Sequence, residues 1–299
     1  MLDFQDTSLY ILIIIFILVA IVIGFFGVKM THVARKLAAD TGIGEALMGA
    51  VFIGASTSLS GIIASVTAAS TGHAEFAVSN ALGGIAAQTF FLAVADMFYR
   101  KANLEHAAAS AENLMMSAFL VTLLSIHLIA FAVPNMSLYS AHPASYLLLI
   151  SYFFGVRLLT KTHKMPMWLP RRTRETRIEK ESIHYYKHSS IKKLWINFTF
   201  YSVIVGFSGW VLSLVGIEIV SITDMSEGLV GGVFTAVSTS LPELVIVITA
   251  VRLKSLTLAV GDIIGATLLT PCLSQCQIWY IVKVRFMRLL QKLNSSGWP

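Results

Sequence analysis

Long apolar runs, separated by shorter polar stretches, repeat along most of the 299-residue chain. A helix needs about 20 apolar residues to cross roughly 30 Å of hydrocarbon, and runs of this length predict an all-α polytopic membrane protein. We expect about eight transmembrane helices. The predicted spans cover residues 8–28, 43–69, 75–98, 111–133, 144–160, 195–217, 227–251 and 256–280.

The composition agrees with a chain whose main solvent is lipid. Hydrophobic residues make up 56% of the chain and charged residues 13%, whereas an ordinary globular domain has about 25% charged residues. The net charge of +6 does not indicate nucleic-acid binding, because the charges lie between apolar runs and not on one basic face. No paired nucleophile and base is visible in the sequence, so we expect neither an enzyme nor a bound cofactor.

Basic residues predict the orientation, because cytoplasmic loops are enriched in Lys and Arg. With the N-terminus outside, the inner loops hold 18 of the 22 Lys and Arg residues. The outer loops 70–74, 134–143 and 218–226 hold none. The other four follow the last span, where strict alternation would place them outside. We expect a multi-pass protein of the plasma (inner) membrane.

A single long polar stretch, residues 161–194, divides the chain into two halves. We interpret residues 1–160 as a first transmembrane repeat of five helices. Residues 195–299 are then a second, shortened repeat of three helices with a basic tail. The stretch between the halves is expected to be a basic cytoplasmic linker, and contact of its arginines with anionic lipid headgroups is the alternative.

An internal repeat becomes visible when the chain is shifted against itself by 182 residues. Between residues 24–83 and 206–265, 19 of 60 positions are identical without a gap. The copies begin five predicted spans apart, an odd number, so they enter the membrane from opposite sides. Inverted-topology repeats place the substrate site near the midplane, where the halves meet. The second half has two spans fewer, which predicts a truncated chain or a partner subunit that completes it.

The best-matched stretch between the two copies is Ser-Thr-Ser-Leu, at residues 56–59 and 238–241. In the second copy, Pro242 and Glu243 follow within an apolar run. Proline lacks the N–H group that would bond the carbonyl group of Ser238, and an ionised Glu at the bilayer centre costs roughly 2.5–3.5 kcal/mol on insertion scales. Glu243 therefore predicts a bound cation, a proton or a cavity; a neutral structural glutamate is the alternative.

Residues 239–243 (Thr-Ser-Leu-Pro-Glu) and 261–270 (Gly-Asp-Ile-Ile-Gly-Ala-Thr-Leu-Leu-Thr) resemble the alpha-repeat of the cation/calcium exchanger superfamily, which includes the sodium/calcium exchangers. The pattern of that family is roughly G-T-S-L-P-E, followed by G-N-x-x-G-S-N-x-x-N or D. The resemblance extends to both repeats and to the span layout. It implies an ion site whose ligands include Thr57 and Ser58 from the first repeat and Thr239, Ser240 and Glu243 from the second.

The chain departs from the family pattern at several ligand positions. In the first repeat, Gly61 replaces the acidic ligand, Gly84 the serine and Gln88 the Asn or Asp. In the second repeat, Ala266 replaces the serine and Thr270 the Asn or Asp. Calcium takes six to eight oxygen ligands and draws much of its affinity from carboxylate charge. A single carboxylate would leave a bound divalent ion half neutralised.

Asp262 is a further acidic candidate. It lies at i, i+4 and i+8 with Ala266 and Thr270, hence on one helix face, about 12 Å along the axis from Thr270. Its counterpart in the first repeat is Asn80. The alternative is a polar residue that faces a water-filled vestibule. The complete set of candidate ion ligands is Thr57, Ser58, Gln88, Thr239, Ser240, Glu243, Asp262 and Thr270.

These features predict a secondary active antiporter that moves Ca²⁺ against Na⁺ or H⁺ by alternating access. Two other hypotheses remain open. The lost carboxylate favours an antiporter for monovalent cations or protons, whereas Gly61 and Ala266 favour a non-transporting membrane scaffold that has lost the site. The expected partners are inorganic cations and the lipid bilayer, without nucleic acid. A homo-oligomer or a completing partner subunit is an open alternative, beside a truncated chain.

Overall fold

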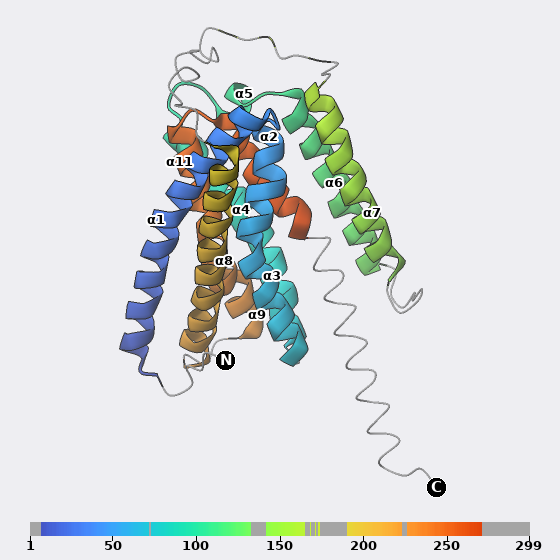
Figure 1. The fold of residues 1–299 in the computed structure, drawn as a ribbon. Coiled ribbons are helices and arrows are strands. Elements are labelled where there is room, and N and C mark those ends of the chain that lie inside the picture. The colour runs from blue at the N-terminus through green and yellow to red at the C-terminus, as the bar shows by residue number, and fades with distance from the viewer. Residues whose placement is uncertain are drawn as a thin grey trace.

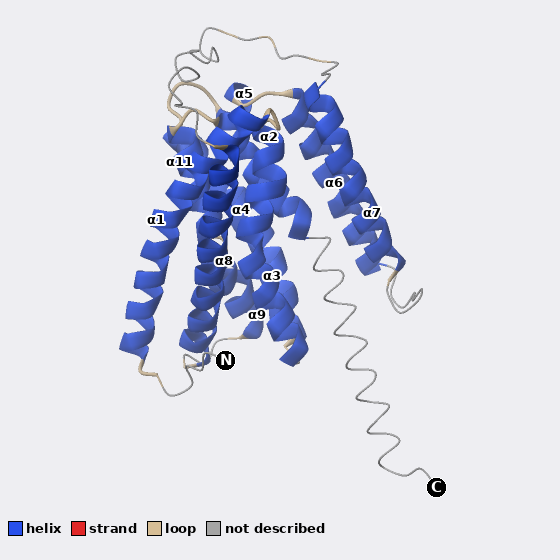
Figure 2. Ribbon diagram, viewed as in Figure 1, coloured by secondary structure: helices blue, strands red, loops and turns tan. Residues whose placement is uncertain are grey.

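A computed structural model describes residues 7–71, 73–132, 142–164, 168, 171, 173, 190–222 and 226–270. Every regular element in this part of the chain is a helix (Figure 2). The predicted all-α class is confirmed. The residues beyond 270, which include the end of the last predicted span and the basic tail, lie outside the described residues.

The helices divide into two groups on either side of the polar linker. The first group is α1 (Leu9–Thr41), α2 (Glu45–Leu47), the π-helical η1 (Met48–Ile53), α3 (Gly54–Thr71), α4 (Ala74–Phe98), α5 (Leu104–Ala107), α6 (Ala111–Ala132) and α7 (Pro143–Lys164). The second group is α8 (Ile191–Ser221), α9 (Glu227–Leu229), the π-helical η3 (Val230–Thr235), α10 (Ala236–Thr239), α11 (Leu241–Arg252) and the helix Leu256–Thr270.

Six helices in the described residues are long and apolar enough to cross a membrane. The segments Val230–Thr239 and Leu241–Arg252 make a seventh span if they are counted together across their 42° bend. The helix Leu256–Thr270 is apolar but shorter. The described parts of all eight predicted spans are thus helical almost throughout, while the number that cross the membrane stays a prediction.

Helix α1 is longer than the apolar run that predicts it. The predicted span ends at residue 28, but the helix continues to Thr41 and is followed by Gly42 with φ 68°. Residues 29–41 contain Ala, Lys, Leu and Arg, which are strong helix formers, and a left-handed glycine is common directly after a helix. The expectation of a loop here was wrong, because the basic residues lie on the helix: Lys29, Arg35 and Lys36.

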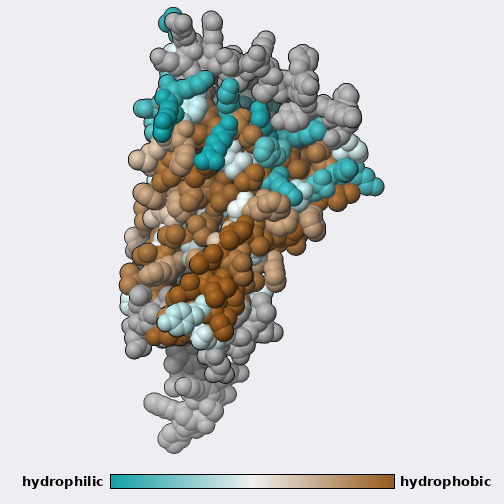
Figure 3. All heavy atoms as spheres, turned by 90° about the vertical axis from the view of Figure 1, so that its left-hand side faces the viewer, coloured by the Kyte–Doolittle hydropathy of each residue, from teal (hydrophilic) through white to brown (hydrophobic). Residues whose placement is uncertain are grey.

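Successive long helices run in alternate directions between the end of the bundle that carries α5 and the opposite end (Figure 1). We call these the α5 end and the far end. Helices α1, α4, α7 and α11 finish at the α5 end, so the basic residues near their C-termini gather there. Hydrophilic residues cluster at that end above a broad hydrophobic band (Figure 3).

The outer face of α1 shows what the hydrophobic band contacts. Ile14, Leu18, Ile21 and Phe25 recur every three or four residues, and each is more than half exposed. Large apolar side chains on one continuous helix face are stable only against an apolar solvent. Together with the apolar spans, they identify a multi-pass integral membrane protein.

The interior is built where α1, α11 and the helix Leu256–Thr270 pack together. Met30 and Leu37 of α1, Ile246 of α11 and Leu258 are completely buried in one apolar cluster. These side chains lie toward the α5 end of the bundle.

The two sequence copies form the same local structure twice. A three-residue helix followed by a six-residue π-helical segment begins at Glu45 and again at Glu227, at the offset of 182 found in the sequence. From these starts, α3 runs from the α5 end to the far end, whereas α10 and α11 run in the reverse direction (Figure 1). Opposite directions are what an inverted repeat requires.

Glycines explain why the equivalent helices cross so closely. A Cβ atom on Gly83 of α4 would overlap the backbone of Gly232 in η3. A Cβ atom on Gly265 would overlap the backbone of Ala50 in η1. The two pairs are again related by the offset of 182, and small residues are what allow helix backbones to approach in membranes.

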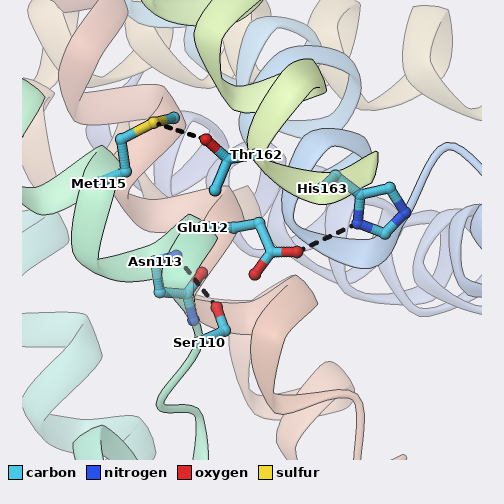
Figure 4. Close-up of polar contacts among 6 residues, drawn as sticks. All are labelled: Ser110, Glu112, Asn113, Met115, Thr162 and His163. Atoms are coloured by element: carbon cyan, nitrogen blue, oxygen red, sulfur yellow. Dashed lines mark hydrogen bonds and ion pairs between the residues drawn. The ribbon is translucent and has the colours of Figure 1, made fainter. Parts of the chain in front are cut away.

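Helices α6 and α7 form a hairpin beside this core. Glu112 and His163 point toward one another, with Oε1 3.1 Å from Nδ1, and the hydroxyl group of Thr162 donates to Met115 Sδ at 3.2 Å (Figure 4). The His163 ring also fills the space beside Gly44, where a Cβ atom would lie 2.5 Å from the imidazole. The α5 end of the hairpin thus packs against the turn between α1 and α2.

Candidate functional site

The break between α10 and α11 is the central feature of the second copy. Ser240 lies at the break, and the two helices meet at 42°. Pro242, the second residue of α11, has no N–H group to bond the carbonyl group of Ser238. The break places Glu243 in the first turn of α11, where the helix dipole favours a negative charge.

A cavity of about 40 Å³ lies beside this break. A cavity needs roughly 10–15 Å³ of such volume to hold one water molecule, so this one fits a small ion with little water. Its lining comes from α3, α4, the α10–α11 break and the end of the last described helix: Ser58, Gly61, Ile62, Ser65, Asn80, Ala81, Gly84, Gln88, Thr239, Ser240, Glu243 and Thr270.

Six of the eight candidate ligands line this cavity. These six residues lie far apart in the sequence, in both halves of the chain, and one cavity brings them together: Ser58, Gln88, Thr239, Ser240, Glu243 and Thr270. Their arrangement places one carboxyl group among hydroxyl and amide oxygens. Ion binding by these six residues remains a prediction.

The other two candidates, Thr57 and Asp262, lie behind the lining. Thr57 is completely buried, contacts the carboxyl group of Glu243, and its hydroxyl group is 3.2 Å from the carbonyl oxygens of Ile53 and Gly54. Asp262 is also completely buried, and neither of its carboxyl oxygens has a partner within the described part of the chain. It is close enough to Glu243 for the two carboxyl groups to interact electrostatically.

A short hydrogen-bond chain holds Glu243 from the side of α4. Gln88 Nε2 lies 3.5 Å from Glu243 Oε1, and the hydroxyl group of Thr267 donates to Gln88 Oε1 at 2.9 Å. Glu243 Oε2 is buried and has no partner among the described residues. Thr267 was not among the candidates, although it directly follows Ala266 in the motif that the candidates came from.

The electrostatics of the cavity favour a cation. Among the described residues that line it, Glu243 is the only charged side chain, and no Lys, Arg or His neutralises it. A buried charge without a partner costs several kcal/mol. A cation bound at Oε2 would remove this cost.

Two lining residues, Ser65 and Asn80, were missed as candidates. Ser65 has an apolar counterpart in the second copy, Val247, so the comparison of the copies does not reveal it. The helical period reveals Ser65, because Ser58, Gly61 and Ser65 are spaced i, i+3 and i+7 along one face of α3. The sequence comparison noted Asn80 only as the counterpart of Asp262.

The two glycines at ligand positions leave open volume. A Cβ atom on Gly84 would meet no described atom within 4 Å. A Cβ atom on Gly61 would have the hydroxyl oxygen of Thr239 as its nearest neighbour in the described residues, at 3.5 Å. The side chains that these positions lack would therefore project into free space of the cavity region. At these two positions of the first repeat, no neighbouring group in the described residues occupies the space of the missing ligand side chain.

A family model described as sodium/calcium exchanger protein matches residues 10–161 and 192–289. The chain belongs to this family. The matched ranges lie on either side of residues 162–191, which they omit. A member of the sodium/calcium exchanger family is a cation antiporter and not an enzyme, as the sequence predicts. A comparison with curated proteins finds no match.

Solved structures show the same fold. The sodium-calcium exchanger NCX_Mj soaked with 100 mM Na⁺ and 10 mM Sr²⁺ matches with a TM-score of 0.67 and 16% identity, over 91% of this chain and 83% of that one. The same exchanger soaked with zero Na⁺ and Ca²⁺ matches with a TM-score of 0.63 and 15% identity, over 90% and 83% of the two chains. At this identity the likeness establishes the fold.

Proposed function

We propose that this exchanger-family protein is a secondary active antiporter that binds its cation at Glu243 and exchanges Ca²⁺ for Na⁺ or H⁺ by alternating access. The observation that carries the proposal is the buried Glu243 carboxyl group, with one oxygen that has no partner among the described residues, in a small cavity lined by both halves of the chain. Transporters built from inverted repeats place their site at such an interface and move one bundle against the other.

The hydroxyl groups around Glu243 support a cation as the ligand. Thr239 donates to the carbonyl oxygen of Ala236 at 3.2 Å, and Thr270 donates to that of Ala266 at 3.1 Å. Because each hydroxyl proton is used within its own helix, the oxygen lone pairs are left for a ligand. Oxygen atoms that can only accept suit hard cations such as Na⁺ and Ca²⁺.

A monovalent cation as the main substrate is the second candidate. It is favoured because Glu243 is the single carboxylate among the described residues of the cavity lining, and one negative charge neutralises Na⁺ fully but Ca²⁺ only by half. The electrostatic interaction of Asp262 with Glu243 favours Ca²⁺ instead, although Asp262 itself does not line the cavity.

The distribution of basic residues supports an orientation with the α5 end in the cytoplasm. Arg100, Lys161, Lys192 and Arg252 all lie near this end, and cytoplasmic ends are enriched in such residues. In this orientation residues 161–194 form a cytoplasmic linker between the halves, and the far end of the cavity faces the outside. The plasma (inner) membrane is the proposed location.

Ion flux into proteoliposomes tests the proposal. We expect ⁴⁵Ca²⁺ uptake driven by an imposed Na⁺ or H⁺ gradient, and background uptake from Glu243→Gln, which has the same size without the charge. Uptake of ²²Na⁺ alone would select the monovalent substrate. If folded wild-type protein moves neither ion under either gradient, the proposal is wrong and a non-transporting scaffold takes its place.

A further inference from the structure

Thr267 of the last described helix contacts Gln88 without being part of the cavity lining. It is 3% exposed, and its hydroxyl group has two polar neighbours. One is Gln88 Oε1 of α4 at 2.9 Å, and the other is the carbonyl oxygen of Ile263 in its own helix at 2.7 Å. A hydroxyl group carries one proton and two acceptor lone pairs, so Thr267 can donate to either oxygen and can also accept.

Two hydrogen-bond arrangements therefore suit the amide group of Gln88. In the first, Thr267 donates to Gln88 Oε1, and the NH₂ group lies 3.5 Å from Glu243 Oε1. An ionised carboxyl group can only accept hydrogen bonds, so it attracts the NH₂ group and repels an amide oxygen. The structure has this arrangement, which suits a carboxylate that has no cation beside it.

In the second arrangement, the amide group of Gln88 is turned by half a rotation, which its terminal torsion allows. Oε1 then faces Glu243, and a cation between the two oxygens attracts both. The NH₂ group faces Thr267 and donates to its hydroxyl oxygen, while the Thr267 proton goes to the carbonyl oxygen of Ile263. Gln88 and Thr267 thus keep their hydrogen bonds in both arrangements, without movement of either helix.

We propose that Thr267 is a positioning residue for cation binding, because its hydroxyl group lets Gln88 present its NH₂ group to the free carboxylate of Glu243 and its oxygen to a bound cation. This inference rests on the proposed function. The pair occurs once in the molecule, since the offset of 182 places Ile85 opposite Thr267 and Thr270 opposite Gln88. The first copy, which lacks the carboxylate, thereby supplies an oxygen ligand when the ion is present.

Equilibrium binding of ⁴⁵Ca²⁺ and of ²²Na⁺ to purified protein in detergent tests this role without requiring transport. Thr267→Val keeps the shape of the side chain and removes the hydroxyl group. Valine leaves the amide oxygen without a donor in the first arrangement and the NH₂ group without an acceptor in the second. Buried N–H groups without a partner are rarer than carbonyl oxygens without one, so the cation-bound arrangement should lose more. We expect about a fivefold weaker affinity, the effect of one typical hydrogen bond.

Thr249 of α11 provides the matched control. It is also buried, and its hydroxyl group donates to the carbonyl oxygen of Val245 at 2.7 Å, away from the cavity lining. Thr249→Val should keep the wild-type affinity, and Thr267→Ser, which retains the hydroxyl group, should restore it. In a Gln88→Leu protein, Thr267→Val should cause no further loss, because its effect passes through the amide group.

A crystal structure of the wild-type protein with bound Ca²⁺ gives a second readout that depends on no variant. Gln88 Oε1 should lie about 2.3–2.6 Å from the ion, the usual distance for a Ca²⁺ ligand. The amide nitrogen of Gln88 should then be within hydrogen-bond distance of the Thr267 hydroxyl oxygen. A bound Ca²⁺ ion at Glu243 without contact to Gln88 would contradict the proposed role of Thr267.

The outcomes separate this role from the proposed function. Wild-type affinity in a folded Thr267→Val protein overturns the positioning role, even if proteoliposomes transport ions normally. A loss that Thr267→Ser does not restore, or that persists in full in the Gln88→Leu protein, also overturns it, because the effect would then come from packing. Wild-type protein that binds neither ion overturns the positioning role and the proposed function together.

Discussion

The same four residues, Ser-Thr-Ser-Leu, lie inside a continuous helix in the first copy and at a helix break in the second. The two residues that follow make the difference. Ser60 keeps its N–H group, and its hydroxyl oxygen lies 3.0 Å from the Thr57 and 3.2 Å from the Thr239 carbonyl oxygen. Pro242 lacks the N–H group, so the second copy bends. Identical residues thus take their local structure from their neighbours.

The charge of the two copies differs at the next position. Glu243 gives the second copy the only carboxylate of the cavity lining in the described residues, whereas Gly61 gives the first copy open volume. One half of the site therefore supplies the charge, and the other supplies neutral oxygens from Ser58, Gln88 and Asn80.

The glycine crossings are shared by both copies, and breaking them should have the largest effect. Gly83→Ala and Gly265→Ala each force a Cβ atom into a neighbouring backbone, and such overpacking costs roughly 1–3 kcal/mol or more. We expect the melting temperature in detergent to fall by about 5 °C or more. Thermal unfolding of the purified variants measures it.

Gly84→Ala is the control for these crossings, because its Cβ atom meets nothing within 4 Å although the residue is next to Gly83. Its melting temperature should stay at the wild-type value. Equal stability of Gly83→Ala and Gly84→Ala would contradict the close crossing of α4 and η3.

Restoring charge to the first copy should remove the asymmetry of the site. In Gly61→Glu, the new Cβ atom has room beside Thr239, and a second carboxylate should raise the apparent Ca²⁺ affinity about tenfold. Titration of ⁴⁵Ca²⁺ binding measures the change. Gly61→Gln adds nearly the same volume without charge and should leave Ca²⁺ binding weak. If Gly61→Glu binds Ca²⁺ no better than Gly61→Gln, the new carboxylate does not reach the ion site.

The smallest effect should come from making the second copy continuous like the first. Pro242→Ala returns an N–H group to the Ser238 carbonyl oxygen and should reduce the 42° bend. Spin labels at the exposed positions Val233 and Arg252 should then move apart by about 2 Å, from the helix rise of 1.5 Å per residue. An unchanged distance distribution would mean that packing, and not the proline, maintains the bend.

Some features of the site could be read from the sequence because they depend on neighbours along the chain. The helical spans follow from apolar run length, and Pro242 with Glu243 predicts a disturbed helix that carries a charge. The offset of 182 pairs glycines whose crossings the structure then shows, Gly49 with Gly231 and Gly83 with Gly265. Even so, local pattern did not show that α1 continues to Thr41, because the end of an apolar run is not the end of a helix.

The sequence alone thus specifies a duplicated, membrane-embedded helical protein with a buried glutamate beside a proline, since these properties lie in composition, period and repeat. Only the tertiary structure decides which polar residues share the cavity. Asp262 has the more suggestive chemistry, yet it is enclosed by η1 and kept from the cavity, whereas Asn80 and Ser65 line it. The physical reason is that the helical period fixes the face on which a side chain lies. How closely two helices approach at a glycine decides whether the second helix covers that face.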